Sequence, residues 1–145
     1  HRESRGLGDV YKRQKHISQV RIHPDNPDVM YVSAQGSPYV DTQDRGVYRT
    51  IDGGKNWKKV LFVDASSGAI DLAMDYTNPR ILYAAFWDHQ RLPWYVRSGG
   101  KGSGIWKSVD GGDTWKKLED GLPKSLWEKL VLLFLEQIQN YYMPL

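Results

Sequence analysis

One eight-residue pattern occurs twice in this chain and constrains the fold more than any other feature. Residues 50–57 are TIDGGKNW and residues 108–115 are SVDGGDTW, so the two copies lie 58 residues apart. Residues 26–31, NPDVMY, resemble residues 78–83, NPRILY, at a spacing of 52 residues. The chain is therefore predicted to be a repeat protein with an insertion in its second repeat, and a period of roughly 40–60 residues indicates a solenoid or a propeller.

Each repeat contains four short strand-like segments separated by turn residues such as Asn-Pro and Asp-Gly-Gly. The expected strands cover residues 19–22, 29–33, 46–50 and 57–62 in the first repeat, and 69–74, 81–85, 104–108 and 114–118 in the second. A meander of four antiparallel strands is the blade of a β-propeller. The predicted fold class is all-β, with two four-stranded blades of an incomplete β-propeller.

The repeated octapeptide is expected to form the hairpin between the third and fourth strands of each repeat. Its Asp accepts hydrogen bonds from backbone N–H groups a few residues on, and its glycines adopt positive φ. Its Trp begins the outer strand, where the ring is expected to fill the gap against a neighbouring sheet. The residues assigned this structural role are Thr50, Asp52, Gly54, Trp57, Ser108, Asp110, Gly112, Thr114 and Trp115.

The second copy matches the Asp-box (BNR) motif throughout, and the first departs only at Asn56, where the motif has Thr. Over roughly residues 16–124 the chain resembles Asp-box β-propellers, most closely a sortilin-like group of secreted bacterial proteins described as glycosyl-hydrolase-like. GAIDL at residues 68–72, Trp94 followed by SGG at 98–100, and GSGIWKS at 102–108 also resemble that group. The resemblance implies a propeller fold and an extracellular or periplasmic location, but one fold hosts many activities.

The two ends of the chain differ from the repeats. Residues 1–14 have no counterpart in either repeat and resemble a translated sequencing-adapter tail of a metagenomic fragment. We expect a non-native leader there, with a genuine basic linker as the alternative. The first blade is then expected over residues 15–65 and the second over residues 66–124.

Residues 125–145 are helix-like, because Leu130, Leu133, Phe134 and Ile138 keep helical spacing. Codons compatible with residues 127–145 also permit, in a shifted reading frame, the peptide GKIGVAVSGANPKLLYAL, which aligns without a gap to residues 68–85. A frame-shifted third blade is the favoured interpretation, and a native C-terminal helix is the alternative. The segment as given is expected to form a helix in either case.

Composition excludes several classes of function. The net charge is +3, but the leader contributes an excess of cations and the rest is close to neutral, so no nucleic-acid partner is predicted. The chain has no cysteine and no apolar run long enough to cross a membrane, so neither a thiolate metal site nor membrane insertion is expected. The histidines lack ligand spacing and no phosphate-binding glycine loop is present, so no metal and no cofactor are predicted.

The candidate ligand site follows from the topology of a blade, in which the Asp-box hairpins lie on the face opposite the other connections. Residues 35–45, 64–68 and the long segment 86–103 should share that other face, where binding usually resides. The long segment combines aromatic, cationic and acidic side chains; the alternative is that Trp87 and Trp94 only fill space between blades. The candidates are Trp87, Asp88, His89, Arg91, Trp94, Tyr95, Arg97 and Asp71.

The expected function is a scaffold that binds a peptide, protein or carbohydrate, with the remaining blades of a full-length protein as further partners. The alternative is part of a sialidase-like or other glycoside hydrolase whose catalytic residues lie mainly elsewhere, so enzymatic activity is left open. Arg45, Arg91, Arg97, Tyr39, Tyr95 and Asp88 supply sialidase residue types without a recognisable spacing. A carboxylate pair of the kind other glycosidases need would come from Asp41, Asp44, Asp71 and Asp88. No catalytic residue is assigned.

Overall fold

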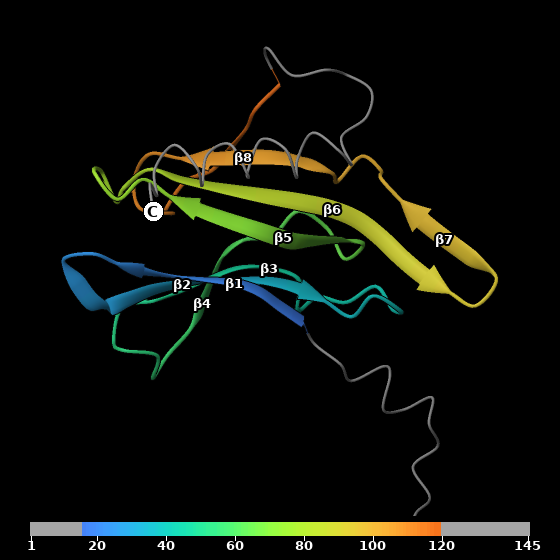
Figure 1. Cartoon of the computed structure of the whole chain (residues 1–145), viewed down its shortest axis with the longest axis horizontal. Helices are drawn as coiled ribbons and strands as arrows, with labels where there is room; N and C mark the ends of the chain where they lie inside the picture. Colours follow the sequence, from blue (N-terminus) through green and yellow to red (C-terminus); the bar gives the residue numbers. More distant parts are fainter. Residues whose placement is uncertain (1–15, 120–145) are drawn as a thin grey trace, which may run out of the picture.

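The computed structural model describes residues 16–119, so the expectations for the leader and for the tail at 125–145 lie outside the described residues. The described part is all-β, which confirms the predicted fold class, and its strands form two antiparallel sheets stacked face to face (Figure 1). The first sheet consists of β1 (His16–His23), β2 (Asn26–Gly36), β3 (Gly46–Thr50) and β4 (Lys58–Leu61), in that order. The second consists of β5 (Ser67–Met74), β6 (Leu82–Leu92), β8 (Gly104–Ser108) and β9 (Lys116–Lys117), and β7 (Tyr95–Ser98) pairs with the far part of β6.

The two sheets pair their strands in the same register, as the sequence repeat requires. Val32 lies opposite Tyr48 in the first sheet, and Ala84 lies opposite Trp106 in the second. On the inner strands, Val20 pairs with Val32 as Leu72 pairs with Ala84. Each position of the first repeat therefore has a structural equivalent in the second.

Three expected boundaries were wrong. Asn26 and Pro27, expected in a turn, begin β2. Segment 86–103, expected as a loop, is largely a hairpin, because β6 continues to Leu92 and pairs with β7 across a turn at residues 93–94. β9 is shorter than the expected strand at 114–118, because the Thr114 N–H donates to the Asp110 carboxylate instead of to a strand.

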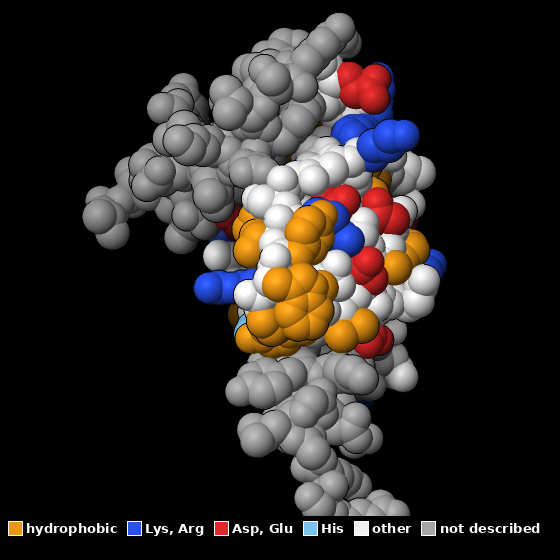
Figure 2. All heavy atoms as spheres, turned by 90° about the vertical axis from the view of Figure 1, so that its right-hand side faces the viewer, with side chains coloured by type: hydrophobic (Ala, Val, Ile, Leu, Met, Phe, Trp, Pro, Cys, Tyr) orange, Lys and Arg blue, Asp and Glu red, His pale blue; other side chains and the backbone are white. Residues whose placement is uncertain are grey.

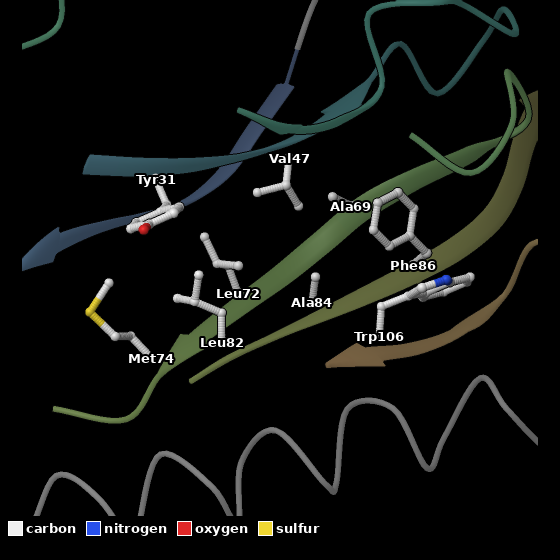
Figure 3. Packing of buried hydrophobic residues seen from close by; sticks show 9 residues of the cluster. All are labelled: Tyr31, Val47, Ala69, Leu72, Met74, Leu82, Ala84, Phe86 and Trp106. Atoms are coloured by element: carbon white, nitrogen blue, oxygen red, sulfur yellow. The ribbon is translucent and has the colours of Figure 1, made fainter. Parts of the chain in front are cut away.

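The core lies between the two sheets (Figure 3). Tyr31 and Val47 point from the first sheet toward buried apolar side chains of the second. The second sheet contributes Ala69, Leu72, Met74, Leu82, Ala84, Phe86 and Trp106. The Phe86 and Trp106 rings meet edge to face, with centroids 4.9 Å apart. Because this cluster draws on both sheets, each sheet buries apolar surface that would be exposed if it stood alone.

The two Asp-Gly-Gly turns, at residues 50–57 and 108–115, have matching hydrogen bonds. Asp110 Oδ1 accepts from the Thr114 N–H at 2.9 Å, and Asp52 Oδ1 accepts from the Asn56 N–H at the same distance. The hydroxyl group of Ser108 donates to Asp110, as the hydroxyl of Thr50 donates to Asp52 in the first copy. Both Asp-Gly-Gly segments place their glycines at φ values between 71° and 89°. A left-handed backbone of this kind favours glycine at these turn positions.

The tryptophans close these same turns. The indole N–H of Trp57 donates to the Gly54 carbonyl, and that of Trp115 donates to the Gly112 carbonyl, both at 3.1 Å. The Trp115 ring also packs against the core cluster between the sheets, whereas Trp57 stays 43% exposed. The expected packing against a neighbouring sheet is therefore found for Trp115 within the described residues.

We expect the two Asp-Gly-Gly turns to make the fold sensitive to acid. Hydrogen bonds from Asn56 and Thr50 lower the pKa of Asp52 to about 2, and bonds from Thr114 and Ser108 lower the pKa of Asp110 well below its usual range. The carboxyls of the unfolded chain titrate near 3.8, so between pH 4 and pH 2 the unfolded chain binds more protons than the folded chain. The free energy of unfolding should therefore fall as the pH is lowered from 4 to 2.

The measurement is the thermal midpoint of unfolding at pH 6 and at pH 2.5. Asp110→Asn should lower the midpoint at pH 6. It should also reduce the difference between the midpoints at pH 6 and pH 2.5, because one titrating carboxylate has been removed. Asp25→Asn, in the exposed turn between β1 and β2, is the matched control and should leave both midpoints unchanged. An unchanged pH dependence in Asp110→Asn would contradict this account.

Candidate functional site

The candidate site lies at the end of the sheets opposite the two Asp-Gly-Gly turns, where the β6–β7 hairpin meets the 37–45 and 62–66 connections (Figure 1). Backbone and side-chain hydrogen bonds join these three segments. The Arg91 N–H donates to the Pro38 carbonyl at 2.7 Å, and the Thr42 N–H donates to the Ala65 carbonyl at 3.0 Å. The Gln90 side-chain amide also donates to the Tyr39 carbonyl. The hairpin is therefore anchored to the first sheet as well as to the second.

Arg45 holds the base of the site together. Its side chain is fully buried, and its guanidinium donates to the carbonyls of Ser37, Ser66 and His89, which come from three different segments. Gly36, at φ 76°, makes room for it, because a Cβ there would lie 2.6 Å from the Arg45 Cγ. Burial lowers the pKa of the Arg45 guanidinium, yet arginine keeps its charge in proteins. A buried cation thus orders the backbone beneath the site.

Arg97 connects the hairpin to the 37–45 connection through two carboxylates. Its Nε donates to Asp88 Oδ1 and its Nη2 donates to Asp41 Oδ1, both at 2.7 Å. The Gln90 side-chain oxygen accepts a third bond from Arg97 at 3.2 Å. Charge-assisted bonds at these distances are among the stronger ones in proteins, and together they fix the position of β7 relative to β6.

His89 is a buried member of the same cluster. Its Nδ1 lies 3.2 Å from the Trp87 carbonyl oxygen, which can only accept, so Nδ1 carries the proton. Its Nε2 lies 3.3 Å from the Gln35 amide nitrogen and accepts from it. Burial lowers the pKa of the His89 imidazole, because a charged ring would lose its hydration there. At neutral pH His89 is therefore a neutral, doubly hydrogen-bonded side chain.

The tip of the hairpin exposes three apolar side chains in a row. Trp94, at the turn, is 82% exposed, and Tyr95 and Val96 beside it are also exposed. Figure 2 views this end of the molecule and shows hydrophobic side chains gathered next to acidic and basic ones. Trp87 behaves differently, because its ring stacks on His89 at a centroid distance of 4.8 Å. Trp94 thus faces solvent, whereas Trp87 belongs to the internal packing.

The structure separates Arg91 and Asp71 from the other candidates. The Arg91 side chain is exposed, and the hydrogen bond of Arg91 to the 37–45 connection comes from its backbone N–H. Asp71 lies on β5 opposite Ala85, and the charge that acts on it is that of Arg21 on β1. Burial raises the pKa of the Asp71 carboxyl. Asp71 is therefore a separate, partly buried acid near the inner strands.

Sequence reasoning missed several members of the cluster. Gln35, Asp41, Arg45 and Gln90 all lie in segments expected on the ligand face, but Asp41 and Arg45 are named individually only as residue types for a hydrolase, and Gln35 and Gln90 are not named as candidates. Arg45 immediately precedes the glycine that opens β3, and Asp41 lies four residues before it. The available indication of their role was that a cation and an acid both lie in a connection expected on the ligand face. Spacing in the sequence alone does not identify the residues that they contact.

Two kinds of feature are absent from residues 16–119. No group of three or more His, Cys, Asp or Glu side chains is arranged to hold a metal ion there. Nor does that part of the chain contain a helix with the length and apolar character needed to cross a membrane.

Comparisons with known proteins bear on the fold. No family model matches the chain, and no curated protein matches it. Among solved structures, a GH74 enzyme from Niastella koreensis is similar, with a TM-score of 0.51 and 22% sequence identity. The similarity covers 77% of this chain and 16% of the enzyme chain. At this level of identity the likeness concerns the fold alone, and the two stacked antiparallel sheets are those of β-propeller blades.

Proposed function

We propose that the two sheets are consecutive Asp-box blades of an exported, sortilin-like bacterial β-propeller, and that the β6–β7 hairpin surface binds a peptide or a glycan. The observation that carries this proposal is the exposed Trp94 on a hairpin whose base is fixed by charge-assisted hydrogen bonds. The paired Asp-box turns support the assignment to the Asp-box group.

The chemistry of the surface suits ligands with both apolar and polar faces. An exposed indole offers a flat platform for a sugar ring or an apolar peptide side chain. Asp41, which retains 39% exposure of its side chain, offers a carboxylate to hydroxyl or amide donors nearby. Because Arg97 already holds the hairpin in place, the hairpin should lose little conformational entropy when a ligand binds.

The test is a binding screen of the full chain against a glycan array and an immobilised peptide library. Trp94→Ala should weaken binding to the ligands found by about tenfold or more, because aromatic anchors dominate such surfaces. Its thermal midpoint should stay unchanged, since the side chain is exposed. Ile51→Ala, an exposed apolar residue at the Asp-box end, is the matched control and should bind normally. Binding that survives Trp94→Ala would remove the hairpin from the proposed site.

A glycoside hydrolase is the second candidate, and the fold similarity to a GH74 enzyme favours it. Burial keeps Asp71 protonated to higher pH than an ordinary Asp, as a general acid requires. Asp88 fits that role less well, because it is ion-paired with Arg97. Turnover of array glycans by the complete protein, lost in Asp71→Asn or Asp88→Asn, would support hydrolysis. Binding without turnover would support the scaffold.

A further inference from the structure

Backbone hydrogen bonds alternate in direction along the β6–β7 hairpin. The Arg91 N–H donates to the Pro38 carbonyl at 2.7 Å, so the backbone groups of Arg91 point away from β7. Arg91 pairs with Val96, and in an antiparallel pair of this kind the groups of both members point outward. The N–H and C=O groups of Val96 therefore point away from β6. Because the direction repeats at every second residue, those of Ser98 do the same.

These outward groups form a free edge where β7 continues the line of β8 along β6 (Figure 1). Within residues 16–119, no hydrogen bond reaches the backbone of Val96 or Ser98 from another segment. The edge strands β1, β4 and β5 are interrupted by register shifts, and β9 has only two residues. β7 keeps four residues in unbroken register. Since irregular pairing and very short length blunt an edge, β7 is the edge of the described part best suited to accept a further strand.

The free edge is fixed in position by the hairpin itself. The Gly99 N–H, directly after β7, donates to the Asp88 carbonyl at 2.8 Å. Gly100 packs so closely that a Cβ on it would lie 2.1 Å from Asp88 Oδ2. The Arg97 guanidinium also binds the Asp88 carboxylate. A partner strand would therefore meet an ordered edge, which keeps the entropic cost of binding low.

The side chains along this edge are apolar, and the unpaired charges beside it are positive. Tyr95 and Val96 point to opposite faces of β7 and are 51% and 65% exposed. Arg91, the cross-strand neighbour of Val96, and Lys101, three residues beyond β7, are exposed and form no ion pair within the described part of the chain. The two carboxylates of the hairpin cluster are already paired with Arg97. The edge is thus complementary to a strand that has apolar side chains and acidic ends.

We propose that β7 binds an extended peptide as an added strand, with backbone hydrogen bonds to Val96 and Ser98. Its β-branched or aromatic side chains lie next to Tyr95 and Val96, and its acidic residues lie near Arg91 and Lys101. The proposal rests on the proposed function, because it concerns the same hairpin, and it narrows the ligand to a peptide. Strand addition takes its affinity from main-chain hydrogen bonds and its specificity from the side chains. A glycan lacks the regular row of N–H and C=O groups that this edge requires.

The probe is a short fluorescein-labelled peptide of alternating valine and threonine with a glutamate at each end, methylated on every second backbone nitrogen. An added strand uses only alternate N–H groups, so this peptide keeps one bonding edge and cannot form sheets with itself. The full chain is titrated into it, and binding is followed by fluorescence polarisation. The same peptide methylated on every nitrogen has the same side chains but no donor, and should bind at least about tenfold more weakly. Lysines in place of the glutamates should also weaken binding.

Two substitutions at one position separate the backbone from the side chain. Val96→Pro removes an outward N–H and no bond to β6, and proline is tolerated at such an edge position. It should weaken binding of the probe by about tenfold. Val96→Ala keeps the N–H and should weaken binding by less than about fivefold. Circular dichroism establishes that both variants are folded.

The outcomes distinguish strand addition from the proposed function on which it rests. Strand addition is overturned if Val96→Pro binds the probe as well as Val96→Ala does, or if full methylation leaves binding intact. It is also overturned if the probe fails to bind at about 1 mM. In each case the hairpin site would still stand if Trp94→Ala weakened binding of the array ligands, because that effect depends on a side chain. A dimer that Val96→Pro abolishes, without binding of the probe, would assign the edge to a second copy and overturn the proposal.

Discussion

Replacing Arg45 with methionine is expected to lower the free energy of unfolding by about 2–4 kcal/mol, because a buried carbonyl left without a donor costs about 1–3 kcal/mol. The carbonyls of Ser37, Ser66 and His89 would each lose their Arg45 bond. Within residues 16–119, the Ser66 carbonyl alone of these keeps another donor, the His89 N–H. Methionine has a similar length but no donor, so it cannot replace these bonds. The measurement is urea unfolding followed by tryptophan fluorescence.

Two further variants separate the role of Arg45 from a general effect of removing charge. Arg91→Met removes an exposed arginine nearby and should change the stability by less than about 0.5 kcal/mol. Arg45→Lys keeps the charge but lacks the planar guanidinium with its several N–H donors. It should therefore recover only part of the lost free energy of unfolding. If Arg45→Met were as stable as Arg91→Met, the guanidinium would not order the base of the site.

Phe86→Ala is expected to cost about 3–5 kcal/mol, the usual range for deleting a buried aromatic ring. Phe86 is fully buried and meets Trp106 edge to face, so the substitution removes an aromatic contact and leaves a cavity in the core. Because the core cluster also contains Tyr31 and Val47, the first sheet should be destabilised together with the second.

Thermal unfolding by circular dichroism measures this effect and shows whether the sheets unfold together. Phe86→Ala should retain a single transition at a lower temperature, since the two sheets share one core. Phe62→Ala is the matched control, because Phe62 is partly exposed and its loss should cost less than about 1 kcal/mol. Two separate transitions in Phe86→Ala would show that the sheets fold independently and would contradict the shared core.

The strands and turns could be predicted because their determinants are close in sequence. Asp110 forms its turn with Ser108 and Thr114, so all the groups involved lie within one octapeptide. The register of the second sheet follows from that of the first because the repeats keep their apolar positions. The ends of several strands were misplaced, and the whole of β7 was missed, because its pairing with β6 lies beyond the repeat.

The candidate site could be predicted only in part. Asp88 and Arg97 were selected together from composition, and the structure joins them directly. Asp41 and Arg45 belong to the same network, but they lie in a connection some 50 residues away along the chain from the hairpin. Asp71 was grouped with the hairpin because both were expected on one face, whereas strand register places it apart from them. Spacing in sequence does not specify such contacts.

The sequence alone determined the repeat, the two Asp-Gly-Gly turns and the all-β class, because these depend on local backbone preferences and on alternation of apolar residues. Tertiary structure alone decided that Arg45 is buried, that burial lowers the pKa of His89, and that Trp94 is exposed while Trp87 is not. Burial and protonation are set by which distant segments exclude water from a side chain and which of their carbonyls and carboxylates face it. Those neighbours exist only once the hairpin and the 37–45 connection have packed together.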